Sequence, residues 1–332
     1  MQEKKNIFQN PIIVSLLAIF CCALWGSATP AIKIGKGLLV PEAYESTAST
    51  ILFAGVRFAF AGLLTVVIYS IARRRVLIPQ KKNVGRILLV SAFQTVIQYI
   101  FFYVGLNNTS GVKGTVLSGT SAFFSVLISA LIFRLEKLTP KKIIACVLGF
   151  AGIIVVNIKG LDLNMTFTGD GFVIFSAIAV AGSSVLMKLF SKHEDPVVIS
   201  GYQFIVGGIV MVVIGLSFGG RITMPNIYAF LILLYLSALS AVAYALWGML
   251  LKFNPVSKVT IFSFMTPVFG TILSLIFLSE DTKVSYLNLI ITLLLVAGGI
   301  FLINYVPKAK ALPEIKEAPK DDVKEEPKEA QN

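Results

Sequence analysis

The sequence predicts an all-α integral membrane protein of ten transmembrane helices, arranged as two inverted five-helix repeats. Its composition is the first reason, because 56% of the 332 residues are hydrophobic and only 14% are charged. The mean hydropathy is +0.84, whereas a soluble domain carries about 25% charged residues. Recurring long apolar runs and an internal repeat supply the number and the arrangement of the helices.

The apolar runs are long enough, at about 18 residues or more, to cross a hydrocarbon core of about 30 Å. Backbone polar groups in lipid must be satisfied within the segment, and the alternation of a β-barrel is absent, so the spans are expected to be helices. The first run lacks a small-residue cleavage site, so we expect it to be retained as the first span. The expected spans are 12–33, 48–71, 86–106, 113–133, 143–159, 171–190, 197–217, 226–250, 257–278 and 286–305.

The internal repeat is read from three segment pairs that recur in order. Residues 125–136 match 269–280 at an offset of 144, and residues 96–106 match 242–251 through Tyr99 and Tyr244, an offset of 145. Residues 148–157 match 295–304, an offset of 147. Because five helices are an odd number, the second copy must enter the membrane from the opposite side. Inverted repeats favour alternating access around a substrate site near the midplane.

Lysine and arginine are distributed unevenly between the two sides of the predicted bundle. The segments on the side of the N-terminus hold 18 of these residues, and those on the other side hold six. This bias predicts that both termini are cytoplasmic, in a plasma or inner membrane. Loop charge of this kind also accounts for the net charge of +12 without nucleic-acid binding. We expect residues 1–11 to be a cytoplasmic N-terminus and 306–332, rich in Lys, Glu and Pro, to be a disordered cytoplasmic tail.

Several sequence runs resemble the two EamA-like domains of the drug/metabolite transporter superfamily. They are LWGSATPAIKIGKG (24–37), FAGVRFAFAGLL (53–64), LIFRLEKLTPKK at the end of span four, GDGFVIFSAIA (169–179) and FMTPVFGTILSLIFLSE (264–280). The resemblance implies domains at 12–160 and 169–305, cytoplasmic termini, and a central cavity lined by spans one, three, four, six, eight and nine. It also implies export of amino acids, other small metabolites or toxic compounds.

One departure from the family pattern concerns span four. Family members often have a proline there at the position matching Pro267 of span nine, but this sequence has Ala122 and Phe123 instead. The helix break is therefore expected on one side only.

Polar and aromatic side chains on the spans expected to face the cavity are the candidate substrate ligands. Span three carries Gln94, Gln98 and Tyr99 on one side, and span eight carries Tyr244 and Trp247. Such residues can alternatively join helices, at about 0.6 kcal/mol per hydrogen bond. The complete candidate set is Trp25, Gln94, Gln98, Tyr99, Ser121, Tyr244, Trp247, Thr266 and Pro267.

Arg57 lies near the middle of span two, where a charge costs on the order of 3 kcal/mol. It can serve a substrate carboxylate or phosphate, or it can be a structural arginine bonded to carbonyl groups between helices. The resemblance does not place span two at the cavity, so the structural interpretation is favoured.

The residue types that catalysis or metal binding would need are missing from the expected spans. No Asp or Glu lies well inside a span, the single histidine, His193, lies in a loop, and Cys21, Cys22 and Cys146 form no C-x-x-C pair. An enzyme, a metal site, a cofactor and a disulfide framework are therefore not expected. Facilitated export or exchange fits at least as well as proton coupling, because the usual proton-relay carboxylate is absent.

Other interpretations remain beside the leading one. An exchanger of phosphorylated or nucleotide-linked metabolites would need several cavity cations, and a channel or a membrane scaffold would show no saturable exchange. Glu136 and Glu280 end corresponding helices at opposite faces and are expected to bond to loops. Small residues in spans five and ten predict close helix packing, within one chain or between the protomers of a homodimer; they are Gly149, Gly152, Gly298 and Gly299.

Overall fold

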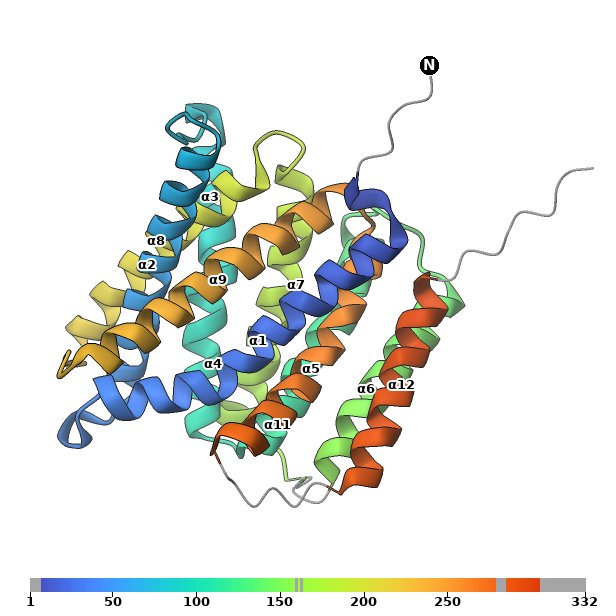
Figure 1. Cartoon of the computed structure of the whole chain (residues 1–332). Helices are drawn as coiled ribbons and strands as arrows, with labels where there is room; N and C mark the ends of the chain where they lie inside the picture. The colour runs from blue at the N-terminus through green and yellow to red at the C-terminus, as the bar shows by residue number, and fades with distance from the viewer. Residues whose placement is uncertain (1–6, 159–160, 162–163, 279–284, 305–332) are drawn as a thin grey trace, which may run out of the picture.

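A computed structural model describes residues 7–158, 161, 164–278 and 285–304 of the chain. The predicted tail at 306–332 and Glu280 lie outside these residues. Within them, ten helices are long and apolar enough to cross a membrane, which confirms the predicted all-α class and the number of spans (Figure 1).

The first repeat contains spans one to five. They are α1 (Pro11–Leu39), α2 (Thr47–Ala72), a third span running from α3 (Val84–Ser91) through the π-helical η4 (Ala92–Ile97) to α4 (Gln98–Asn107), a fourth formed by α5 (Gly111–Leu127) and η5 (Ile128–Ile132), and α6 (Pro140–Asn157). Short 3₁₀ turns lie at η1 (Ile7–Gln9), η2 (Glu42–Tyr44) and η3 (Lys81–Asn83).

The second repeat contains spans six to ten. They are η7 (Phe167–Gly171) with α7 (Phe172–Phe190), then α8 (Pro196–Ser217), α9 (Ile227–Phe253), a ninth span of α10 (Val256–Thr260), the 3₁₀ turn η8 (Ile261–Phe264) and α11 (Met265–Leu278), and finally α12 (Tyr286–Asn304).

Side-chain caps set where several of these helices begin. The Ser46 hydroxyl accepts a hydrogen bond from Ser49 N (3.1 Å) at the start of α2. At α8 and α9 the same role falls to Asp195, whose Oδ1 accepts from Val197 N (2.9 Å), and to Asn226. Each cap satisfies a backbone N–H that has no partner inside the helix.

The chain termini distinguish the two faces of the bundle. The terminal face is the end where α1 begins and α12 ends, and the opposite face is the other end. The first repeat starts at the terminal face with Pro11, whereas the second starts at the opposite face with Phe167, so the repeats are inverted (Figure 1).

The contacts between helices are also related by the repeat: a contact in one place recurs between the equivalent helices when the two halves are interchanged. The equivalent helices α2 and α8 pack on each other, as do α6 and α12 (Figure 1). The contact of α5 with α7 corresponds to that of α11 with α1, and α4 with α7 corresponds to α9 with α1.

The expected span boundaries differ from the structure most at span one. Its helix continues through Pro30 and ends at Leu39, six residues beyond the predicted end at residue 33. The predicted difference between spans four and nine is present: α5 is continuous through Ala122 and Phe123, while η8 interrupts span nine just before Pro267.

Glycines let α2 and α8 approach until their backbones touch. A Cβ built on Gly208 would lie 2.7 Å from Gly55 O, and one built on Gly62 would lie 2.5 Å from Gly201 O. A side chain at either position would therefore force the two helices apart, because such distances are well inside van der Waals contact.

Gly208→Ala is accordingly expected to lower stability by about 1–3 kcal/mol, the usual cost of overpacking a well-filled interior. Gly298→Ala is the matched control, since Gly298 lies in a membrane-spanning helix and a Cβ there would meet nothing within 4 Å. Thermal unfolding in detergent micelles measures both variants. Equal unfolding temperatures for the two would contradict the close contact of α2 with α8.

Gly152 of span five and Gly299 of span ten serve packing within the chain, whereas Gly298 makes no such contact. A Cβ on Gly152 would lie 2.9 Å from Val296, and one on Gly299 would lie 2.6 Å from Ala145 O. The Thr292 hydroxyl donates to Gly152 O across the same contact (2.9 Å). These residues therefore hold α6 against α12.

Candidate functional site

A cavity of about 700 Å³ lies between the two halves of the bundle. It is lined by spans one, three, four, six, eight and nine, as the family resemblance implied, and additionally by α2. The structure brings every candidate residue to this one cavity, although their role as substrate ligands stays a prediction. The candidates on its wall are Trp25, Arg57, Gln94, Gln98, Tyr99, Ser121, Tyr244, Trp247, Thr266 and Pro267.

Arg57 departs from the sequence-based interpretation. Residue Arg57 is 3% exposed and lines the cavity, so the expectation that span two stays away from it was wrong. Its guanidinium carbon lies 4.2 Å from the centre of the Phe58 ring and 5.8 Å from that of Tyr99. Its Nε has no hydrogen-bond partner among the described residues, and its guanidinium packs on aromatic rings rather than facing lipid.

The two tyrosines related by the internal repeat meet across the cavity wall. Tyr99 on α4 and Tyr244 on α9 place their hydroxyl oxygens 3.4 Å apart. The repeat therefore puts equivalent residues of both halves side by side, which is where a substrate can contact both halves at once.

A cluster of aromatic side chains extends from this tyrosine pair toward the terminal face. The Trp25 ring centre lies 5.1 Å from that of Tyr244 and 4.9 Å from that of Trp247, both in edge-on arrangements. The rings offer the cavity an apolar surface, and the buried indole N–H of Trp25 has no partner among the described residues.

The π-helical η4 brings both glutamines of span three to the cavity. Gln94 lies inside η4, and Gln98 begins the α-helix that follows. η4 is anchored on α8 through Gln203: Ser91 Oγ donates to its carbonyl (2.8 Å) and Thr95 Oγ1 to its side-chain oxygen (2.7 Å). Single π-helical turns of this kind occur often at functional sites.

Several other hydroxyl groups on the cavity wall bond within their own helix. Ser118 Oγ donates to Gly114 O (2.7 Å) and Ser184 Oγ to Val180 O (3.1 Å). The Ser237 hydroxyl lies within hydrogen-bonding distance of two carbonyl oxygens, Leu233 O in its own helix (2.8 Å) and Arg57 O on α2 (3.0 Å).

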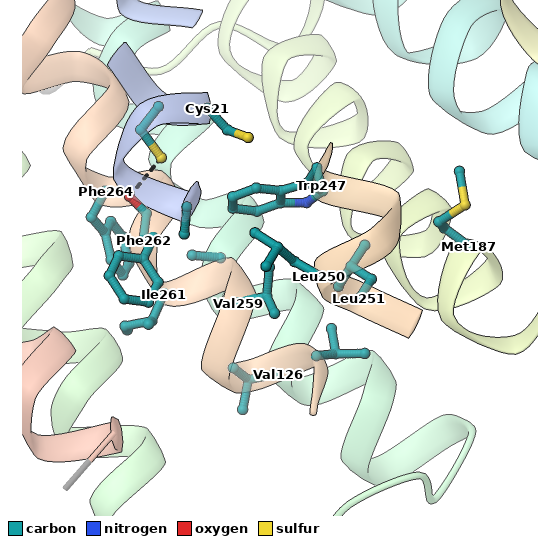
Figure 2. Close-up of a cluster of buried hydrophobic side chains, with 14 of the residues drawn as sticks. Cys21, Val126, Met187, Trp247, Leu250, Leu251, Val259, Ile261, Phe262 and Phe264 are labelled. Atoms are coloured by element: carbon teal, nitrogen blue, oxygen red, sulfur yellow. Dashed lines mark hydrogen bonds between the residues drawn. The ribbon is translucent and has the colours of Figure 1, made fainter. Parts of the chain in front are cut away.

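The cavity is closed toward the terminal face. There its wall is formed by Met187, Leu251 and Thr260, which are 2%, 1% and 3% exposed. Figure 2 shows Trp247 and Leu250 within the buried cluster that fills this end, beside Val259 and Ile261.

The cavity wall near the opposite face includes exposed residues, among them Lys33, Asn107 and Gly111. The molecule is therefore open to the opposite face and closed to the terminal face.

Glu136 fastens the closed end by joining span four to span nine. Its carboxylate accepts hydrogen bonds from Ser129 Oγ (2.8 Å), Ser257 N (2.9 Å) and the Ser257 hydroxyl, and pairs with Lys142 Nζ at 2.6 Å. Burial alone would raise the pKa of this carboxyl, but the hydrogen bonds from Lys142, Ser257 and Ser129 together hold that pKa below its ordinary value. The loop bonding predicted for Glu136 is thus found, and it includes the start of α10.

A buried ion pair near the opposite face was missed by the sequence reasoning. Asp170 and Lys113 are 0% and 6% exposed, and their Oδ2 and Nζ lie 3.0 Å apart. Asp170 also accepts from Thr109 Oγ1 (2.5 Å) and Thr166 N (2.7 Å). The pair ties the start of α5 to η7. The sequence did contain a signal for this pair, because Lys113 and Asp170 lie at the starts of spans four and six, which both begin at the opposite face.

Comparison with known proteins identifies the family. The EamA-like transporter family matches residues 12–158 and 167–305, which together make up most of the chain. This chain belongs to the EamA-like transporter family. It is accordingly a membrane transporter with a small-molecule substrate, and not an enzyme.

Relatives of this EamA-like transporter match nearly its whole length. The uncharacterized transporter YvbV of Bacillus subtilis is 28% identical over 304 residues, covering 89% of this chain and 93% of YvbV. The uncharacterized transporter sll0355 of Synechocystis is 25% identical over 303 residues, or 85% and 86% of the two chains. A crystal structure with 18% identity superposes with a TM-score of 0.70 over 87% of this chain and 97% of its own, which shows a shared fold.

Proposed function

We propose that this EamA-like transporter is a secondary carrier that exports or exchanges small metabolites by alternating access. The observation that supports the proposal is one cavity between inverted halves, closed at the terminal face and open at the opposite face. A carrier needs a second state with the reverse accessibility, and the inverted repeat supplies the matching geometry.

The substrates proposed are amino acids or similar small amphipathic molecules. The cavity wall combines aromatic rings with amide and hydroxyl groups, a mixture that typically binds small organic ligands. Exchange of phosphorylated or nucleotide-linked metabolites is less well supported, because Arg57 is the one cation within the deeply buried wall among the described residues.

We also propose that both termini are cytoplasmic, in the plasma or inner membrane. The excess of lysine and arginine on the terminal-face side supports this orientation. In that frame the structure is outward-open, and Glu136 stands at the cytoplasmic end of the closed gate.

Counterflow in proteoliposomes tests the carrier. Vesicles are preloaded with one amino-acid pool at a time, and entry of labelled amino acid is followed without an ion gradient. We expect saturable exchange that falls at least tenfold in Gln98→Ala or Tyr244→Ala, since these side chains contact the proposed site from different halves.

Leu63→Ala is the control variant, because Leu63 is an exposed residue on the outer surface of α2. Its exchange should equal that of the unmodified protein. Flux without saturation would indicate a channel, and no flux in any pool with correctly folded protein would contradict a carrier of amino acids.

A further inference from the structure

The wall of the cavity carries unmet hydrogen-bond donors. Trp25 Nε1 and Arg57 Nε are both buried without a partner among the described residues. Each of these atoms can only donate, because neither the indole nor the guanidinium nitrogen accepts hydrogen bonds. Thr266 Oγ1, which can donate or accept, is the third such atom on the wall. Most buried polar atoms in proteins are hydrogen-bonded, so a ligand with acceptor oxygens would complement this wall.

The charge of the wall has one sign. No aspartate or glutamate lines the cavity among the residues that the structure describes. Among the described residues, no carboxylate lies within 4.0 Å of the Arg57 guanidinium, which packs against the Phe58 and Tyr99 rings instead. A ring face compensates a buried cation only by about 0.5–2 kcal/mol, whereas removing the charge from water costs several times more.

We propose that this site recognises a carboxylate on an apolar body, with Arg57 binding the carboxylate and the Trp25–Trp247 pair packing against the body. The ammonium group of an amino acid is not required, since the wall holds no acidic residue to receive it. The transport of such a substrate rests on the proposed function above, but its binding does not.

The positions of the residues fit one small amphipathic anion. Tyr99 lies beside Arg57, its hydroxyl lies 3.4 Å from that of Tyr244, and the Tyr244 ring in turn contacts Trp25. The anion site and the aromatic surface are thus consecutive along one wall. A phosphate dianion would need further cations, but Lys33 and Lys36 lie near the opposite face rather than beside Arg57, and Lys36 is paired with Glu45 at 3.7 Å.

The chain contains its own binding reporter. Its two tryptophans are Trp25 and Trp247, and both line the cavity. A ligand that packs on them should change their fluorescence, which is excited at a wavelength where phenyl compounds do not absorb. Three probes share one body and differ in charge: L-phenylalanine, 3-phenylpropionate and 2-phenylethylamine.

Titration of the unmodified protein in detergent is the first experiment and needs no variant. We expect the two carboxylates to bind with similar affinity and the amine to bind at least about tenfold more weakly, in line with the worth of a charge-assisted hydrogen bond. Equal or tighter binding of the amine would overturn the proposal, and so would the lack of a saturable response to both carboxylates. Phenyl phosphate binding tenfold more tightly than 3-phenylpropionate would also overturn it, in favour of a phosphorylated substrate.

Variants then assign the anion site. Arg57→Gln should weaken binding of both carboxylates by about 10- to 100-fold and leave the amine unchanged, with Arg57→Lys in between because it keeps the charge but loses the planar fork. Arg75→Gln is the control, since Arg75 is exposed in the loop after α2. Unchanged carboxylate affinity in a folded Arg57→Gln protein would overturn the assignment.

Counterflow with the same probes separates this inference from the proposed function. Binding that depends on Arg57 without any exchange would contradict the carrier and leave the carboxylate site standing. Exchange of the amine at a rate that Arg57→Gln leaves unchanged would contradict the carboxylate site and leave the carrier standing.

Discussion

Asp170→Asn is expected to lower the free energy of unfolding by about 3–5 kcal/mol, because it leaves the buried Lys113 ammonium without its counter-charge. The amide keeps the shape of the carboxylate, so the effect isolates the charge. Both partners are nearly inaccessible, and the Asp170 carboxylate also accepts hydrogen bonds from Thr109 and Thr166. Unfolding by denaturing detergent in mixed micelles measures the change.

Two further variants sharpen this prediction. The double variant Lys113→Met with Asp170→Asn should recover part of the loss, since no buried charge remains unpaired. Glu45→Gln is the control, because its ion pair with Lys36 is 3.7 Å long and largely exposed, and such pairs contribute at most about 1 kcal/mol. A loss in Glu45→Gln as large as that in Asp170→Asn would contradict the assigned burial.

Glu136→Ala is expected to open the terminal face. The variant removes the acceptor that joins Ser129 of span four to Ser257 at the start of α10, together with the partner of Lys142. Bonds to a charged group contribute about 1.5–3 kcal/mol each, so the ratio of closed to open molecules should fall by about ten- to one-hundredfold. Spin labels on Cys introduced at the exposed Lys137 and Pro255 measure the distance across this contact.

Glu194→Ala is the matched control on the same face. Glu194 accepts hydrogen bonds from Gln80 N (3.0 Å) and Asn83 Nδ2 (3.1 Å), which join loops away from the closed end of the cavity. The distance between the labels should therefore be unchanged in this variant. Closure that is unaffected by Glu136→Ala would show that the apolar cluster around Trp247 suffices by itself.

The pH dependence of closure follows from the pKa of the Glu136 carboxyl. Its hydrogen bonds keep the pKa of the carboxyl below the ordinary value in the closed state. Its contribution is therefore complete at pH values above the ordinary range for glutamate, and it is lost as the pH falls through the lowered pKa. The distance between the labels should be constant from about pH 6 to 8 and lengthen only under strongly acidic conditions.

Much of the fold could be predicted from the sequence because its signals are local and repeated. Apolar length gives each span, the odd number of spans per repeat gives the inversion, and matched segments gave the pairing of Tyr99 with Tyr244. The polar side chains of the cavity were also found, since polar residues in long apolar runs are few.

The features that were missed depend on contacts between distant segments. Asp170 lies 57 residues after Lys113, and no local pattern shows that they meet. Ser257 lies 144 residues after Lys113, the offset of one repeat. These equivalent positions at the starts of spans four and nine bind different acidic groups: Lys113 pairs with Asp170 at the opposite face, and Ser257 bonds to Glu136 at the terminal face. The π-helical η4 depends on Gln203 of another helix, and the position of Arg57 depends on how α2 is rotated.

If the cavity opens to the two faces in alternation, distances between paired spin labels at both faces should change together. One pair of labels replaces Lys137 and Pro255 at the terminal face, and the other replaces Gly37 and Gly111, where added side chains meet nothing within 4 Å. Both pairs are measured in lipid bilayers, with and without Glu136→Ala. We expect reciprocal shifts, with the terminal-face distance lengthening as the opposite-face distance shortens. Simultaneous lengthening of both distances, or a change confined to one face, would contradict it.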